Sequence, residues 1–242
     1  MNQVRKFVTP LFEVSTEVNL AARPIAEFRA NTFYSKIEHR CPKHQQFPLI
    51  LIPPEIATPE QLHLTPAIYR FWSEDEKWST FLGPRMAAAN VRDWPGYPEY
   101  RGFVLEVMEN FLSLAVEPIV ERFSIGFYNR IEIESISELK ETISMPLDID
   151  ETSSLQETLF QRARMTEVGS VLTQIIMMQG DAYTPKPYVS INNIIRGHNP
   201  IGHNLTTSDL LAWLDKSHDV GKEAIWTVLS QTVKDAWEKN DA

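Results

Sequence analysis

The longest alternating stretch of the chain runs from Arg122 to Glu134. One set of alternate positions is apolar and holds Phe123, Ile125, Phe127, Ile131 and Ile133. The other set is polar apart from a gap at Gly126, and it holds Arg122, Ser124, Tyr128, Arg130, Glu132 and Glu134. Successive side chains of a strand point to opposite faces of a sheet. The stretch therefore predicts a long central strand with one buried face and one wetter face.

Other segments carry either this two-residue period or the 3.6-residue period of a helix. Further strands are predicted over residues 11–19, 68–73, 78–82, 85–91, 168–178 and 189–195. Helices are predicted over residues 24–41, 100–114, 135–142, 155–164 and 206–237. Gly221 is expected to kink the last of these helices. The proline-rich residues 48–66 are expected to form an extended connector.

This order of elements predicts an α+β fold, with amphipathic helices packed on one face of a mainly antiparallel sheet. Residues 1–242 are expected to form a single α+β domain, a length that fits one large domain or two small ones. A weak internal duplication is an alternative, because a long strand followed by a meander and a helix recurs from Leu11 and from Arg122. It would divide the chain into halves 1–116 and 117–242.

The composition narrows the classes of function. A net charge of −9 argues against wholesale binding to nucleic acid, which favours a basic surface. The single cysteine, Cys41, excludes an internal disulfide and suits a reducing compartment. The sequence contains no apolar run near the length of a membrane span, and its first residues lack the apolar core of a signal peptide. A cytoplasmic protein without membrane contact is therefore expected.

Four segments carry a family resemblance: Pro10–Val14, Trp94–Tyr97, Ser124–Ile131 and Leu210–His218. Together they resemble a sporadically distributed family of uncharacterised bacterial proteins of similar length. That family opens on a Pro–apolar–x–Glu strand, has a strand ending in Asn-Arg-Ile, and carries Leu-Leu-x-x-Leu-x-x-x-His in its last helix. Gly126 stands where the family has an arginine. The resemblance implies no activity, and it associates the chain with mobile or phage-defence genes.

Four residues of the long strand are candidates for binding. Asn129 interrupts the apolar row, and a buried amide must find hydrogen-bond partners. It would either tie the strand to a neighbouring segment or line a pocket or interface. Arg130, with Tyr128 and Arg122 on the opposite face, could bind an anion or a partner's carboxylate. Pairing of this row with glutamates on the next strand is the alternative.

A second candidate is the polar loop 197–204, which contains His198 and His203. It could serve catalysis or recognition, or simply connect two elements. His39–His44 and the acidic run Asp148–Glu151 lack a standard metal-ligand spacing, so neither a metal nor another cofactor is expected. The sequence also contains no nucleophile elbow and no phosphate-binding glycine loop.

These observations favour a non-enzymatic binding or accessory protein of a bacterial defence or toxin-neutralising module. The acidic chain would suit a basic protein partner, and a homodimer could cover an edge of the sheet. One alternative is an enzyme of unrecognised type that uses His198, His203 and Arg130, with Asp148. Another alternative is a nucleic-acid sensor built on the aromatic residues around the meander.

Overall fold

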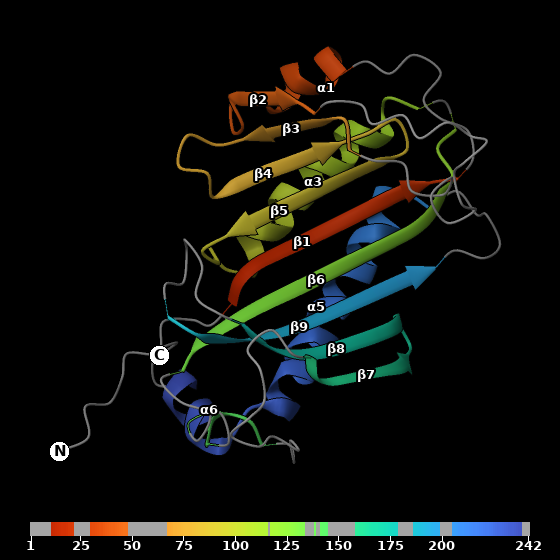
Figure 1. Ribbon diagram of the computed structural model, residues 1–242. Helices are drawn as coiled ribbons and strands as arrows, with labels where there is room; N and C mark the ends of the chain where they lie inside the picture. Colours follow the sequence, from red (N-terminus) through yellow and green to blue (C-terminus); the bar gives the residue numbers. More distant parts are fainter. Residues whose placement is uncertain are drawn as a thin grey trace, which may run out of the picture. The chain divides into compact units, whose positions relative to one another are not determined.

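The computed structural model describes residues 11–21, 30–47, 67–115, 117–133, 138, 141–144, 158–178, 186–198 and 205–238. This part of the chain forms nine strands and four helices (Figure 1). The strands are β1 (Leu11–Leu20), β2 (Lys43–Gln46), β3 (Tyr69–Trp72), β4 (Trp78–Leu82), β5 (Met86–Arg92), β6 (Val120–Glu132), β7 (Thr158–Thr166), β8 (Gly169–Met178) and β9 (Tyr188–His198). The helices are α1 (Ala30–Ile37), α3 (Tyr97–Leu112), α5 (Thr207–Val228) and α6 (Gln231–Glu238).

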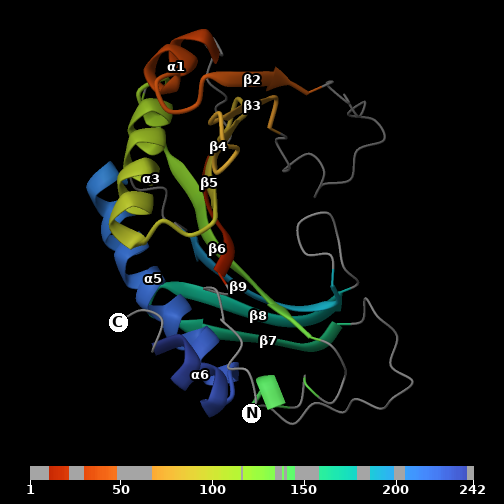
Figure 2. The same ribbon diagram turned by 90° about the vertical axis from the view of Figure 1, so that its left-hand side faces the viewer.

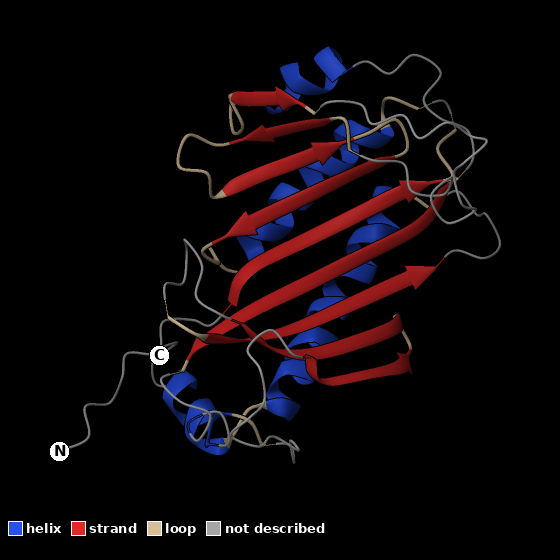
Figure 3. Ribbon diagram, in the orientation of Figure 1, coloured by secondary structure: helices blue, strands red, loops and turns tan. Residues whose placement is uncertain are grey.

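The strands form one antiparallel sheet in the order β2-β3-β4-β5-β1-β6-β9-β8-β7 (Figure 3). This confirms the predicted α+β fold and the predicted antiparallel sheet. The alternation of the long strand is also confirmed, because the odd-numbered side chains from Phe123 to Ile133 are all buried. The described helices do not include one long and apolar enough to cross a membrane.

The chain forms two compact units, and each draws on separate stretches of sequence. Unit 1 comprises the described residues of Met1–Val14, Gly126–Ile195 and Asp215–Ala242. Unit 2 comprises those of Ser15–Ile125 and Arg196–Leu214. Strands β1, β6 and β9 and helix α5 contribute residues to both units. The predicted halves 1–116 and 117–242 stay a prediction.

In unit 2, helix α3 packs on β5, the last strand of the meander β3–β4–β5 (Figure 2). Strand β5 is buried at every position from Met86 to Val91, and its run of alanines leaves room for the helix. Helix α3 buries an aromatic and aliphatic stripe, and the hydroxyl of its Tyr100 lies 2.6 Å from Oγ1 of Thr16 on β1. The predicted stripe of residues 100–114 is therefore the contact surface of this helix.

In unit 1, helix α5 packs on β6, β8 and β9 around a core of isoleucines and valines. Ile131, Ile175, Ile191 and Ile225 belong to this core. The helix comes very close to β6 at Gly221, where an added Cβ would lie 2.4 Å from Cε2 of Phe127. In each unit the helices thus lie on one face of the strands, as predicted.

The prediction of a helix over residues 155–164 is wrong. Thr158–Thr166 forms strand β7, which pairs with β8 from Thr158↔Ile176 to Thr166↔Gly169. The physical reason is the hairpin with β8: a two-residue turn at Glu167–Val168 sets the two strands side by side. A sheet neighbour of this length outweighs the weak helical spacing of so short a segment.

Two further elements differ from the predictions. The last helix ends at Val228 instead of continuing to Trp237, and a separate helix, α6, begins at Gln231. Helix α5 is continuous through Gly221, where the kink stays a prediction. Leu229 forms a β-bridge with Ile143, and the Ser230 N–H donates to the Thr142 carbonyl at 2.8 Å. These contacts with residues 142–143 separate α5 from α6. Strand β2 was not predicted; it pairs with β3. Residues 24–29 and 48–66, and most of 135–142, lie outside the described residues.

Candidate functional site

Asn129 is buried on the helix-facing side of β6, with 2% of its surface exposed. Its Nδ2 donates to the carbonyl of Ile191 on the neighbouring strand β9 at 2.9 Å. A side-chain bond of this kind adds a cross-link between two strands that are already paired through their backbones. Of the two interpretations of Asn129, this geometry matches the one in which it ties β6 to a neighbouring segment.

Arg130 lies on the other face of β6, between two aromatic rings. Its guanidinium carbon is 3.6 Å from the centroid of Phe12 on β1 and 4.8 Å from that of Tyr188 on β9. Cation–π contacts of this kind contribute about 0.5–2 kcal/mol each. Beside it, the ring of Tyr128 folds back over Gly126, where an added Cβ would lie 2.7 Å from the Tyr128 hydroxyl. Gly126 thus makes room for this tyrosine.

The remaining predicted site residues lie in the other unit or outside the described side chains. Arg122 is exposed and belongs to unit 2. His198 ends β9, and its side chain lies outside the described part of the structure. His203 and the acidic run Asp148–Glu151 also lie outside it. Their proposed roles stay predictions.

The segment His39–His44 has structural contacts instead of a metal-ligand geometry. His39 Nε2 lies 3.2 Å from Glu106 Oε1, and Arg40 Nε lies 3.4 Å from Glu106 Oε2. Burial raises the pKa of the Cys41 thiol to about 12, so the thiolate ligand that metals prefer is disfavoured. Among the residues with described positions, no three His, Cys, Asp or Glu side chains form a group that could hold a metal ion.

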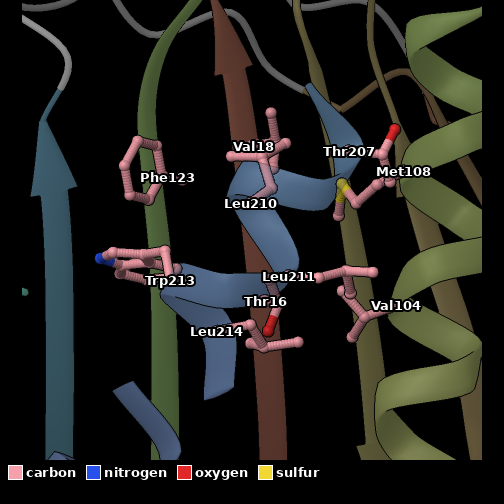
Figure 4. A pocket seen from close by; sticks show the side chains of 10 residues that line it. All are labelled: Thr16, Val18, Val104, Met108, Phe123, Thr207, Leu210, Leu211, Trp213 and Leu214. Carbon is pink, nitrogen blue, oxygen red and sulfur yellow. The ribbon is translucent and has the colours of Figure 1, made fainter. Parts of the chain in front are cut away.

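An apolar depression in unit 2 is a packing feature (Figure 4). It is lined by Thr16, Val18, Val104, Met108, Phe123, Thr207, Leu210, Leu211, Trp213 and Leu214. Its cavity volume is about 10 Å³, which is room for a single water molecule at most. Phe123 and Trp213 meet edge to face with ring centroids 4.5 Å apart. The depression is too small to bind a ligand.

The described residues place a different candidate at the edge of the sheet in unit 1, on strand β7. This nine-residue strand is the last in the sheet order and has a single described neighbour, β8. Met165 on this strand is 78% exposed. The other large hydrophobic side chain that is exposed among the described residues, Ile119, is 39% exposed. An uncovered edge strand presents backbone N–H and C=O groups that can pair with another chain.

A pocket lies between this edge and helix α5. It is lined by Phe160, Arg162, Arg164, Thr173, Ala224, Thr227 and Val228, and its cavity volume is about 100 Å³. Arg162 stands opposite Thr173 on β8, and Arg164 stands opposite Val171, so both arginines lie on the helix-facing side of β7. The lining contains two cations and no carboxylate.

The threonine hydroxyls of this pocket already donate hydrogen bonds within the protein, so the two arginines are its available side-chain donors. Thr173 Oγ1 donates to Asn193 Oδ1 at 2.8 Å, and Thr227 Oγ1 donates to the carbonyl of Ala224 at 2.8 Å, so both hydroxyl protons are used. No described carboxylate lies within ion-pair distance of the guanidinium of Arg162 or Arg164. The pocket can therefore supply two charged donors to an acceptor from outside.

A buried amide lies one hydrogen bond further in. Asn193 on β9 is fully buried, and its Nδ2 has no hydrogen-bond partner within the described structure. An unsatisfied buried donor of this kind costs about 1–3 kcal/mol. The contacts from the pocket through Thr173 to Asn193 thus form a polar path beside the isoleucine and valine core of unit 1.

The histidine of helix α5, His218, is a packed side chain with a lowered pKa. Burial lowers the pKa of His218, although the adjacent Asp219 carboxylate, 3.4 Å from Nδ1, acts in the opposite direction. The imidazole also contacts the ring of Phe127, with centroids 6.3 Å apart. His218 belongs to the interface between α5 and β6 and does not line the β7 pocket.

Sequence reasoning missed β7 because it assigned the segment to a helix. The alternation of this segment is weak: Arg162 and Arg164 alternate with Ala163 and Met165, but Phe160 and Gln161 reverse the order of polar and apolar residues. The turn into β8, Glu167–Val168, lacks the Asn-Gly or Asp-Gly pair that marks most short hairpins, so the segment had no turn signal.

Comparison with known proteins adds no identity to this geometry. No protein-family model matches the chain, and no curated protein matches it. The resemblance to a bacterial family stays an expectation that rests on four short motifs.

Proposed function

We propose that the protein is a non-enzymatic binding protein that acts through protein–protein contact, as an accessory component of a bacterial defence or toxin-neutralising module. The binding role is inferred from the uncovered edge of strand β7. The strand is nine residues long, has one described neighbour and exposes Met165. The assignment to a defence module rests on the family resemblance alone.

Edge strands of this kind are commonly used for recognition. Natural proteins shorten, cover or interrupt a free edge, because a long one recruits other chains. An added strand gains main-chain hydrogen bonds, and pockets beside the edge select its side chains. Strand β7 combines the free edge with a pocket that holds two arginines. A partner that adds a strand here would satisfy both features.

The test is co-purification with the products of the neighbouring genes, using Ala163→Lys to block the edge. Ala163 is exposed and lies on the face of β7 away from the pocket, so a lysine there adds a charge to the edge without entering the core. The wild-type protein is expected to retain a neighbour's product. Ala163→Lys is expected to lose it, because an added strand would bury the new charge beside Met165, on the face away from the arginines.

Gln45→Lys on β2 is the matched control, because it places the same charge on the strand at the other end of the sheet order. This control should retain the partner. Failure of every neighbour's product to co-purify with the wild-type protein would contradict the proposed function.

A further inference from the structure

We propose that β7 binds an extended acidic segment of a protein partner as an additional strand, with two carboxylates at alternate positions paired with Arg162 and Arg164. The inference rests on the proposed function and specifies the chemistry of the partner. It is drawn from the charge, the register and the lining of the edge pocket.

The spacing of the two arginines matches the repeat of a strand. Arg162 and Arg164 are two positions apart and lie on one face of β7. Side chains directly opposite each other on neighbouring strands have Cβ atoms about 4.5–5.5 Å apart. Acidic residues at positions i and i+2 of an added strand would therefore stand beside one arginine each. Guanidinium–carboxylate pairs of this kind are strong and directional.

The opposite face of β7 exposes apolar side chains that an added strand could cover. Ala163 and Met165 lie on it, and Met165 is 78% exposed. The residue between the two acids of an added strand would lie on this face and cover part of Met165. The edge thus predicts a recognition pattern in which acidic and apolar residues alternate.

A second copy of this chain does not fit the same edge. Strand β7 contains no Asp or Glu from Thr158 to Thr166. If two copies paired through β7, neither arginine would meet a carboxylate within the paired strands, and a register centred on Ala163 would set Arg162 against Arg164. Like charges directly opposite each other destabilise a strand pair. Charge complementarity therefore favours an acidic partner.

The overall acidity of the chain does not oppose this choice. The net charge of −9 acts over long distances and favours a partner that is basic as a whole. The edge acts at contact distance, where the two arginines of the pocket face no described carboxylate. A partner that is basic overall can satisfy both conditions by presenting one acidic strand.

Arginines that point inward from an edge strand also have a protective function in some sheets, because they discourage edge-to-edge pairing. The two explanations differ in a measurable way. A protective edge binds no strand, whatever its charge, whereas a recognition edge binds an acidic strand and rejects a neutral one.

The experiment uses synthetic peptides and the full-length protein. A fluorescein-labelled peptide that alternates Glu with Val is compared with one that alternates Gln with Val, by fluorescence anisotropy. The Glu peptide should bind about tenfold more tightly than the Gln peptide. Its affinity should fall as salt is added, because the paired charges are partly exposed. Equal affinity of the two peptides, or no binding of either, would overturn the inference.

Variants assign the effect to the arginines. The double variant Arg162→Gln/Arg164→Gln should bind the Glu peptide about as weakly as the wild-type protein binds the Gln peptide. Arg196→Gln, which removes an exposed arginine from β9, is the matched control and should bind like the wild type. The charge-reversed variant Arg162→Glu/Arg164→Glu should prefer a peptide that alternates Lys with Val. This gain of binding would show that the variant is folded.

Two further results separate this inference from the proposed function. If Ala163→Lys loses the co-purified partner while the double glutamine variant keeps it, the acidic segment is refuted and the binding role of the edge stands. If sedimentation shows a wild-type dimer that Ala163→Lys dissociates, a second copy occupies the edge and the inference is overturned.

Discussion

Gly221 has a hydrogen where alanine has a methyl group, and this allows α5 to lie close to β6 in unit 1. Gly221 lies on the buried side of the helix, with Ser217 and Ala224 as its small neighbours on that side. The space of its missing side chain is filled by the ring of Phe127, whose Cε2 would be 2.4 Å from an added Cβ. Cβ atoms do not approach ring carbons so closely, so either the helix or the ring must move when this glycine is replaced.

Gly221→Ala is therefore expected to lower the free energy of unfolding by about 1–3 kcal/mol, which is the usual cost of overpacking a core. Urea unfolding followed by circular dichroism measures the change. Gly102→Ala on α3 is the control, because nothing lies within 4 Å of a Cβ at that position. This control should be neutral or should raise stability by up to about 1 kcal/mol, since alanine favours a helix more than glycine does. Equal destabilisation by both variants would refute the packing argument.

Most of the elements could be predicted from the sequence, because their periods are unbroken. The alternation of Phe123, Ile125 and Phe127 identified β6, and the stripe from Tyr100 to Leu112 identified α3. The edge strand β7 could not be identified in this way. Its two arginines face a pocket and not a fully buried core, so the contrast between its faces is weak. The end of α5 depends on Thr142 and Ile143, which are distant in sequence, so local spacing could not locate it.

The start of α5 follows a local rule and was located correctly at Thr206. The Asp209 N–H donates to Thr206 Oγ1 at 3.2 Å, and the Thr206 N–H donates to Asp209 Oδ2 at 2.9 Å. This reciprocal pair gives a hydrogen-bond acceptor to two backbone N–H groups at the start of the helix, those of Thr206 and Asp209. The helix is long and serves the core of unit 1, so its first turn is worth testing.

Thr206→Ala is expected to lower the free energy of unfolding by about 1 kcal/mol, because an N-cap acceptor is lost. Thermal unfolding measured by circular dichroism detects a change of this size. Ser208→Ala is the matched control: Ser208 is an exposed residue of the same turn, and no side-chain hydrogen bond is found for it within the described structure. The capping role would be wrong if the two substitutions had the same effect.

At the scale of the whole molecule, the two units share secondary structure. Strands β1, β6 and β9 and helix α5 each pass from one unit to the other. Unfolding either unit therefore removes part of an element that the other unit uses. Continuity of this kind is typical of a single cooperative structure.

We therefore expect one unfolding transition for the chain. Cys41 reports on unit 2, because it is fully buried and its pKa is raised to about 12, so a thiol reagent should modify it only after opening. Hydrogen exchange at the backbone of β8 reports on unit 1. The two probes should give the same midpoint in urea. Separate midpoints would show that the units unfold independently.

The central place of β1 has a consequence for synthesis of the chain. Its neighbours in the sheet are β5 and β6. Between Leu20, where β1 ends, and Val120, where β6 begins, the ribosome must add about 100 residues, which takes about 5–20 s at typical rates. During that interval the nascent chain holds a strand whose second partner does not yet exist. An unpaired strand edge exposes the nascent chain to aggregation, so a chaperone that shields β1 would be useful at that stage.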